Sequence, residues 1–143
     1  MTKRNFLPLL AMFLLAAGSL NAQISRPVKA NIPFDFTAGG VDLPAGEYQI
    51  AATGTPGNLL IRGEGTQGMF LVSYAAQTNR VEASSKLVFH RYGDRYFLSQ
   101  IWEQGEVRGS ELPMMKVEKE LRASNAGRIW HYYFPQNHSH EIG

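Results

Sequence analysis

The fold class of this chain is decided by one stretch, residues 84–102, which reads SSKLVFHRYGDRYFLSQIW. Two runs rich in β-branched and aromatic residues flank the pair Gly93-Asp94, and such a pair between such runs is a typical two-residue hairpin turn. Further short runs of the same kind, separated by turns that contain glycine or proline, lie on both sides. The sequence therefore predicts a mainly β protein: an antiparallel β-sandwich or partly open barrel of roughly six to seven short strands, with one C-terminal α-helix.

The register of this hairpin has two solutions. A two-residue loop, Gly93-Asp94, places Phe89 opposite Leu98, and polar and apolar residues then mix on one face. A three-residue loop beginning at Tyr92 places Phe89 opposite Phe97 and gives a cleaner apolar face. Because burial of one face specifies register more strongly than turn preference does, we favour the three-residue loop, or a β-bulge that reconciles the two patterns.

The first 22 residues have the features of a secretory signal peptide. Lys3 and Arg4 form a basic start, and residues 6–17 form an apolar core that is short for a membrane span. We expect cleavage after Ala22, or after Ser19 as the alternative, and export to the periplasm or the extracellular space. An uncleaved membrane anchor is the weaker alternative, because the apolar core has the length usual in signal peptides.

The composition limits how the exported chain can be stabilised and which partners it can bind. There is no cysteine, so no disulfide stabilises the fold, and a hydrophobic core must do so. Residues 23–143 suffice for a single β-rich domain and are too few for two. The formal net charge of +2 is carried by Lys3 and Arg4, so the chain without them is formally neutral. We therefore expect no nucleic-acid partner, no stable membrane insertion of the mature chain and no cofactor.

Three further segments have strand patterns. Residues 28–37 alternate strictly between apolar and polar, which predicts a half-buried strand, and Pro33 within it predicts a position at a sheet edge. Residues 47–53 follow a turn at 43–46. Residues 69–75 are apolar on both faces, which favours a central strand.

One α-helix is predicted at about residues 113–124. Ser110 is its candidate N-cap, and Met114, Val117 and Leu121 form one apolar stripe. Glu118 and Arg122 have the spacing of an i,i+4 ion pair. Residues 128–135 then predict an aromatic last strand, and we expect residues 135–143 to form a flexible polar tail.

Two groups of titratable residues invite a chemical interpretation. The side chains of His138, His140 and Glu141 are of the types that bind zinc. A polar chain end, however, offers few neighbouring groups that would hold the imidazoles in position, so we predict no metal site. The segment His90 to Arg95 carries an imidazole, two guanidinium groups and a carboxylate at a hairpin tip. Cross-strand charge and aromatic pairs explain that segment more simply than acid–base chemistry does.

A hydrolase would need a stronger signal than the sequence contains. Asp35, Asp42 and Glu47 lie near the first turn, where a suitably spaced carboxylate pair would hydrolyse glycosides. Their spacing does not require such a pair, and no serine lies in a nucleophile-elbow context. We therefore predict no catalytic residue and no enzyme.

The remaining candidates are surfaces. Unpaired backbone groups at a sheet edge invite another strand, which makes the strand at residues 28–37 a candidate docking site. Tyrosine and tryptophan combine apolar area with a polar tip and recur in binding faces, although most aromatic residues of a small domain belong to its core. The predicted interaction surface therefore consists of Ile32, Phe34, Trp102, Trp130 and Tyr132.

Three blocks of the chain resemble a group of small secreted bacterial proteins of the Acidobacteria type. The blocks are IPFDF at residues 32–36 leading to LPAGEY at 43–48, the hairpin segment at 85–102, and ELP at 111–113. The resemblance covers most of the chain after the signal peptide, and the sequence departs from the group from Ile129 onward. The resemblance implies export, and it implies no activity, ligand or site residue.

These observations favour an exported, non-catalytic binding or interaction module of the cell envelope with an unknown protein or glycan partner. An extracytoplasmic hydrolase that uses surface carboxylates near Asp35 and Glu47 is one alternative, and a purely structural envelope protein is another. A concave pocket with two carboxylates about 5–10 Å apart would favour the hydrolase.

Overall fold

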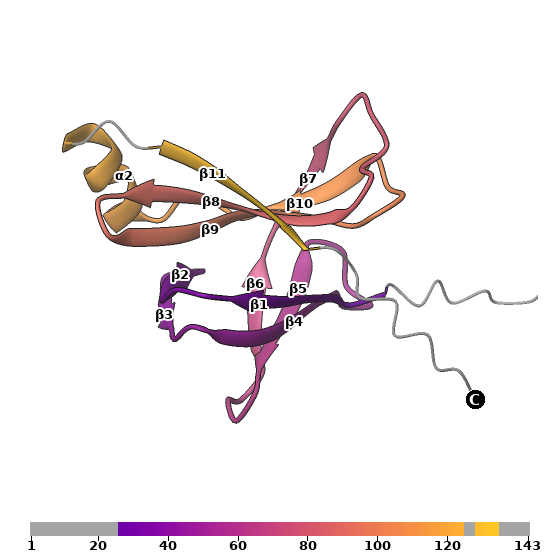
Figure 1. The fold of residues 1–143 in the computed structure, drawn as a ribbon, viewed down its shortest axis with the longest axis horizontal. Coiled ribbons are helices and arrows are strands. Elements are labelled where there is room, and N and C mark those ends of the chain that lie inside the picture. The colour runs from indigo at the N-terminus through magenta and orange to yellow at the C-terminus, as the bar shows by residue number, and fades with distance from the viewer. Residues whose placement is uncertain (1–25, 125–127, 135–143) are drawn as a thin grey trace, which may run out of the picture.

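The structure is a computed structural model that describes residues 26–124 and 128–134. Two β-sheets lie one above the other, and one α-helix lies beside the larger sheet (Figure 1). The prediction of a mainly β, sandwich-like protein with a C-terminal helix is confirmed. The described strands outnumber the six to seven expected. One reason is that two of the predicted strands, residues 28–37 and 69–75, each form separate strands in the two sheets. The predicted signal peptide and the tail at 135–143 lie outside the described residues.

The smaller sheet contains four antiparallel strands in the order β1-β4-β5-β6. Their bounds are Val28–Ile32 for β1, Gly46–Ala52 for β4, Asn58–Gly63 for β5 and Met69–Val72 for β6. Hairpin connections join β4 to β5 and β5 to β6. In the part of the chain that the structure describes, β1 and β6 are therefore the two edges of this sheet.

The larger sheet has the order β11-β8-β9-β10-β7. Its strands are β7 (Tyr74–Gln77), β8 (Ser85–Tyr92), β9 (Arg95–Trp102), β10 (Arg108–Glu111) and β11 (Arg128–Phe134). Two short strands, β2 (Phe36–Ala38) and β3 (Val41–Leu43), pair with each other, and Thr37 of β2 pairs with Phe97 of β9 in the one parallel contact among the described strands. Helix α2 (Lys116–Ser124) lies near the turn that joins β8 to β9 (Figure 1).

The core lies between the two sheets and is filled by alternate residues of each strand. In β1, the side chains of Val28, Ala30 and Ile32 are buried and those of Lys29 and Asn31 are exposed, as the alternation predicts. Both sheets contribute to this core, whose members from β4, β5, β6, β8 and β9 include Tyr48, Ile50, Leu59, Ile61, Leu71, Leu87, Phe89 and Leu98.

The hairpin of β8 and β9 has a two-residue loop and a β-bulge. Tyr92 pairs with Arg95 across Gly93-Asp94, and Phe89 pairs with Leu98. The register then shifts between Val88 and Phe89, so that Leu87 pairs with Ile101. The three-residue loop that we favoured is wrong, whereas the alternative of a bulge is confirmed. The bulge lets the turn keep its preferred length while Leu87 and Ile101 both reach the core.

The predicted strand at residues 28–37 is two strands in different sheets. β1 ends at Ile32, and β2 begins at Phe36 in the larger sheet. Pro33, which lacks a backbone N–H, lies at this break. Phe34 fills the crossing: its ring stacks on Tyr96 with centroids 3.8 Å apart and meets Phe89 edge-on at 5.0 Å. The predicted edge position is confirmed for β1, and the predicted continuity past Ile32 is wrong.

The prediction of a central strand at residues 69–75 is also wrong. This segment forms β6 and β7, which are edge strands of the smaller and the larger sheet respectively. Leu71 and Ser73 are buried, but the alternate side chains of Phe70, Val72 and Tyr74 are exposed. The apolar residues on both faces of this segment were interpreted as a sign that other parts of the protein pack against both faces. In the structure, only the inner face packs against the core.

Helix α2 differs from its prediction in start and orientation. It begins at Lys116, and Ser110 belongs to β10, which pairs with both β7 and β9 and so cannot provide an N-cap. Val117, placed on the predicted buried stripe, is exposed, and Glu118 is buried in its stead. The expected stripe is therefore wrong at Val117.

Gly109 on β10 lies where a side chain does not fit. A Cβ atom there would lie 2.6 Å from Cε3 of Trp102 and 2.8 Å from the carbonyl oxygen of Ile101. We expect Gly109→Ala to lower the free energy of unfolding by about 1–3 kcal/mol, because the overpacked side chain displaces a sheet strand. Gly54→Ala, where no atom lies within 4 Å, is the control in denaturant unfolding. Equal stability of the two variants would contradict this view of β10.

Candidate functional site

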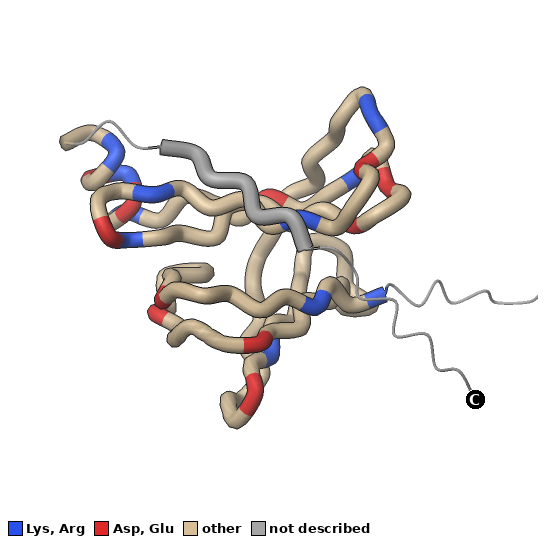
Figure 2. Tube along the Cα trace, viewed as in Figure 1, with Lys and Arg blue, Asp and Glu red and all other residues tan. Residues whose placement is uncertain are grey.

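The segment Met69–Gln77 forms an edge of both sheets. β6 pairs only with β5, and β7 pairs only with β10, within the described part of the chain. The segment contains no charged residue and no proline, and Figure 2 shows no charged position along β6 and β7. Charges and prolines on an edge strand hinder pairing with another strand, so this edge has neither of these protections.

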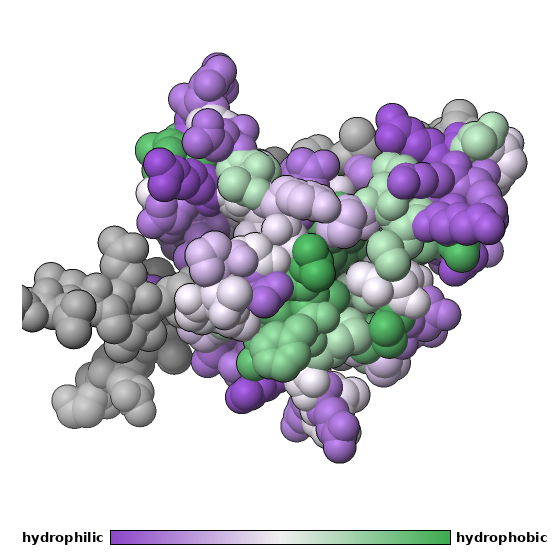
Figure 3. All heavy atoms as spheres, turned by 180° about the vertical axis from the view of Figure 1, so that it is seen from behind, coloured by the Kyte–Doolittle hydropathy of each residue, from purple (hydrophilic) through white to green (hydrophobic). Residues whose placement is uncertain are grey.

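Three large side chains project outward from this segment at alternate positions. The exposed fractions are 71% for Phe70, 59% for Val72 and 63% for Tyr74. Half-buried Leu60 on β5 pairs with Phe70 and extends the apolar surface across the sheet. Figure 3 shows apolar surface gathered in the middle of the face on which β6 lies. We call Phe70, Val72 and Tyr74 the outward row.

The opposite edge of the smaller sheet, β1, is protected. Its outward residues are Lys29 and Asn31, and Pro33 follows the strand directly. A lysine and a proline at an edge are two common means by which proteins prevent unwanted strand pairing. β1 was the edge that we predicted as the docking site, but β6 is the edge more open to a partner strand.

The five residues of the predicted interaction surface do not gather on one exposed face. Ile32 is fully buried at 0% exposed, Trp102 is 6% exposed, and Phe34 is half-buried against Phe89 and Tyr96. Trp130 and Tyr132 lie in β11, where their backbones pair with Phe89 and Leu87; their side chains lie outside what the structure describes. The outward row of β6 and β7 was missed, although the absence of charge and proline between residues 69 and 77 was visible in the sequence.

A buried carboxylate joins α2 to β8. Oε1 of Glu118 lies 2.6 Å from Nδ1 of His90 and accepts a hydrogen bond from the hydroxyl of Tyr92 at 3.3 Å. His90 and Tyr92 are two residues apart on β8 and so face the helix together. Burial, and then the negative charge of Glu118, raise the pKa of Tyr92 above its usual 10.0. Arg122 was predicted as the partner of Glu118. That prediction is wrong, because the Glu118 carboxylate is buried and contacts His90 and Tyr92 instead.

The other residues at the hairpin tip have structural contacts. The Nε–H of Arg91 donates to the carbonyl of Gly93 at 2.7 Å, and its guanidinium lies 5.3 Å from the ring centroid of Tyr96, its cross-strand partner. The guanidinium of Arg95 lies 5.1 Å from the ring of Phe97. The Arg91–Tyr96 contact fits the expectation that cross-strand charge and aromatic pairs stabilise the tip, whereas Arg95 and Phe97 are neighbours on the same strand, β9.

The carboxylates considered for hydrolysis hold the turns around β2 to β4. Asp35 accepts a hydrogen bond from the backbone N–H of Ala45 at 2.9 Å, and Asp42 accepts one from the hydroxyl of Thr37 at 2.6 Å. Glu47 is exposed on β4. Among the side chains of residues 26–124, no three His, Asp or Glu gather as a metal site would require.

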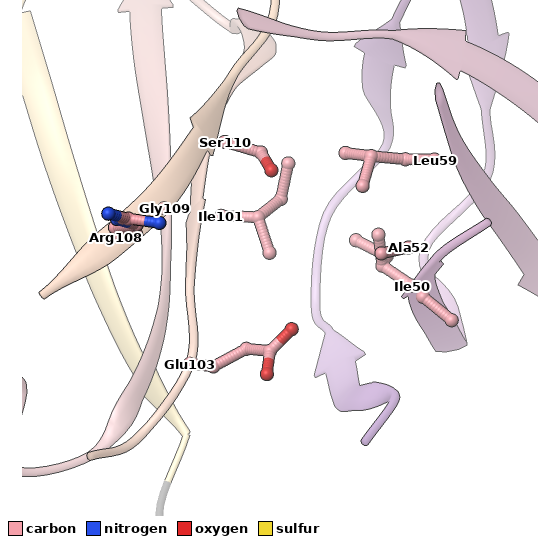
Figure 4. A pocket seen from close by; sticks show the side chains of 9 residues that line it. Ile50, Ala52, Leu59, Ile101, Glu103, Arg108, Gly109 and Ser110 are labelled. Carbon is pink, nitrogen blue, oxygen red and sulfur yellow. The ribbon is translucent and has the colours of Figure 1, made fainter. Parts of the chain in front are cut away.

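A cavity of about 160 Å³ lies between the sheets. Its walls are apolar side chains of both sheets, and Glu103, Arg108 and Ser110 are its polar lining residues (Figure 4). The Glu103 carboxylate and the Ser110 hydroxyl point into the space. Glu103 is the one carboxylate in the lining, so the cavity lacks the pair that glycoside hydrolysis uses. Its volume is also below the roughly 300–1,000 Å³ of small-molecule sites.

Comparison of the chain with protein-family models, curated proteins and solved structures gives no match. In the described part of the chain, no helix has both the length and the apolar character needed to cross a membrane. The edge formed by β6 and β7 is therefore the candidate functional site on physical grounds alone.

The contact of Glu118 with His90 and Tyr92 predicts a stability effect. We expect Glu118→Ala to lower the free energy of unfolding by about 1–3 kcal/mol, because it removes the hydrogen-bond partner of a buried hydroxyl and of an imidazole nitrogen. Glu120→Ala, whose carboxylate is exposed and lies 3.9 Å from Lys116, should change it by less than about 0.5 kcal/mol. Denaturant unfolding measures both. A Glu118 variant as stable as the Glu120 variant would contradict an anchoring role.

The raised pKa of Tyr92 predicts a pH dependence. In the folded state Tyr92 keeps its proton at pH values where the unfolded chain loses it, so stability falls as pH rises above about 10. Tyr92→Phe removes this group, and the variant should lose less stability than the wild type between about pH 9 and about pH 11. Tyr48, whose pKa burial also raises, maintains part of the slope. Identical slopes for wild type and variant in alkaline unfolding experiments would refute the prediction.

Proposed function

We propose that the chain is an exported, non-catalytic binding module of the cell envelope that accepts a β-strand from a protein partner at the edge formed by β6. One observation carries the proposal: Met69–Gln77 is an edge of both sheets, is free of charge and proline, and exposes the outward row. The signal-peptide pattern of residues 1–22 supports the exported location.

Strand addition suits this edge physically. The unpaired side of an edge strand offers backbone N–H and C=O groups to an incoming strand, and alternate side chains provide specificity. Covering the outward row removes apolar surface from water, which is favourable by roughly 25 cal/mol for each Å² covered. The partner segment that fits best is therefore extended, uncharged and apolar at alternate positions, so that it continues both the backbone ladder and the row of Phe70, Val72 and Tyr74.

A protein partner has more support than a glycan. Sugar-binding faces use exposed aromatic rings as platforms, and Trp102, the tryptophan whose side chain the structure describes, is buried. Phe70 and Tyr74 of the outward row are exposed rings, but they lie along a strand edge, whose backbone groups suit a protein strand. A hydrolase also has less support, because Asp35 and Asp42 are engaged in turns and the cavity between the sheets is lined by a single carboxylate.

Affinity capture with matched lysine variants tests the proposal. Residues 23–143 are used as bait against envelope extract, in wild-type form and as Val72→Lys and Val81→Lys. Val81 is 61% exposed, as Val72 is 59% exposed, but lies outside β6 and β7. We expect wild type and Val81→Lys to capture the same protein and Val72→Lys to lose it by about tenfold or more, because a charge at the edge opposes strand pairing. Circular dichroism checks that all three variants fold.

Hydrogen exchange locates the contact. Partner binding should slow exchange of the amides in residues 69–77, whose outward groups become paired. Capture that persists in Val72→Lys, or protection confined to other residues, would rule out the β6 edge as the binding site. A wild-type bait that captures no protein would count against a binding function and favour the structural role.

A further inference from the structure

One end of the larger sheet carries polar side chains on its inner face. Ile101 of β9 belongs to the core, and Ser110 of β10 is its direct cross-strand partner, so both side chains project from the same face. Glu103 lies two positions beyond Ile101 and continues this face just past the end of β9. A hydroxyl and a carboxylate therefore lie where the alternation of a sandwich strand would place core residues, and such departures from a local rule are expected at functional sites.

These two polar side chains line the cavity of about 160 Å³ between the sheets. Ile50 of β4, Leu59 of β5 and Ile101 are buried and form its apolar walls. Glu103 and Ser110 are half-buried, and their oxygen atoms project into the space from the larger sheet, toward the apolar side chains of β4 and β5 (Figure 4). The cavity therefore has an apolar side and a polar side.

The size and the charge of this cavity limit what it can hold. An apolar cavity of about 150 Å³ binds a molecule of the size of benzene, so the apolar part of a ligand here has about six carbon atoms. The Glu103 carboxylate and the Ser110 hydroxyl both accept hydrogen bonds, and the carboxylate is negatively charged. Arg108, the guanidinium of the lining, is exposed and lies farther from the space in Figure 4. The charge that faces a ligand is therefore negative.

We infer that this cavity binds a small primary amine with a short apolar body, whose ammonium group donates hydrogen bonds to Glu103 and Ser110. An ammonium group has three N–H donors and no acceptor, which matches these two oxygen-bearing side chains. Hydrogen bonds between charged groups are roughly twice as strong as neutral ones, which favours an amine over an alcohol of the same shape. The inference goes beyond the proposed function, because none of the lining residues belongs to β6 or β7.

Benzylamine is the probe that tests this site, because its ring has the size of the apolar part and its ammonium group is the expected head. A ¹H–¹⁵N NMR titration of residues 23–143 follows the backbone amides. We expect saturable shifts centred on the residues that line the cavity, with a dissociation constant between about 0.1 and about 10 mM, as suits so small a ligand. Benzoate has the same ring and the opposite charge, and it should bind at least about tenfold more weakly.

Two glutamine variants test the carboxylate. Glu103→Gln keeps the size of the side chain and removes its charge, and it should weaken benzylamine binding by about tenfold or more, because a charge-assisted hydrogen bond becomes a neutral one. Glu106→Gln changes an exposed glutamate of the same loop outside the lining, and it should bind benzylamine as the wild type does. Circular dichroism checks that both variants fold.

Three outcomes would overturn the inference: equal affinity of the two glutamine variants for benzylamine, benzoate binding as tight as benzylamine binding, or shifts that do not saturate and are spread over exposed carboxylates. The comparison of benzylamine with benzoate uses the wild type alone, so it decides even if a variant does not fold. Val72→Lys, which alters the β6 edge, should bind benzylamine as the wild type does. Protein capture at β6 and amine binding between the sheets can therefore fail separately.

Discussion

The burial of Phe89 between the two sheets is the contact on which the rest of the structure depends. Its side chain is 0% exposed and meets Phe34 and Phe36 edge-on, with ring centroids 5.0 and 5.7 Å away. Phe34 and Phe36 belong to the segment that leaves the smaller sheet and enters the larger one. In a chain without disulfides, this aromatic cluster connects the hairpin to the other layer, and apolar burial supplies the stability that crosslinks supply in many exported domains.

Sequence reasoning succeeded where the determining interactions are local. The alternation from Val28 to Ile32 identifies the buried face because each side chain of a strand points opposite to its neighbours. Gly93-Asp94 identifies the hairpin because the turn is set by the conformational freedom of two adjacent residues. The bulge at Val88 was only one of the alternatives, because it depends on Leu87 reaching Ile101 in the folded sheet.

The candidate site was missed for a physical reason. Periodicity shows that Phe70, Val72 and Tyr74 share a face, but it does not show whether another layer covers that face. Glu118 presents the opposite case: a charged residue on a short helix is usually solvated, and only the folded sheet brings His90 and Tyr92 within reach of it. Both errors concern which part of the molecule lies opposite a residue, and that depends on contacts between segments distant in sequence.

Within the described residues, the chain crosses between the two layers at three places: residues 33–35, residues 44–45 and Ser73. Each crossing leads directly from a strand of one sheet into a strand of the other, so a sliding or hinge motion of one layer over the other would have to break a hydrogen-bonded ladder at these crossings. The two layers therefore form a single mechanical unit. A force applied to β6 passes through Ser73 into β7 and the larger sheet. A molecule bound at this edge would therefore transmit force to both sheets.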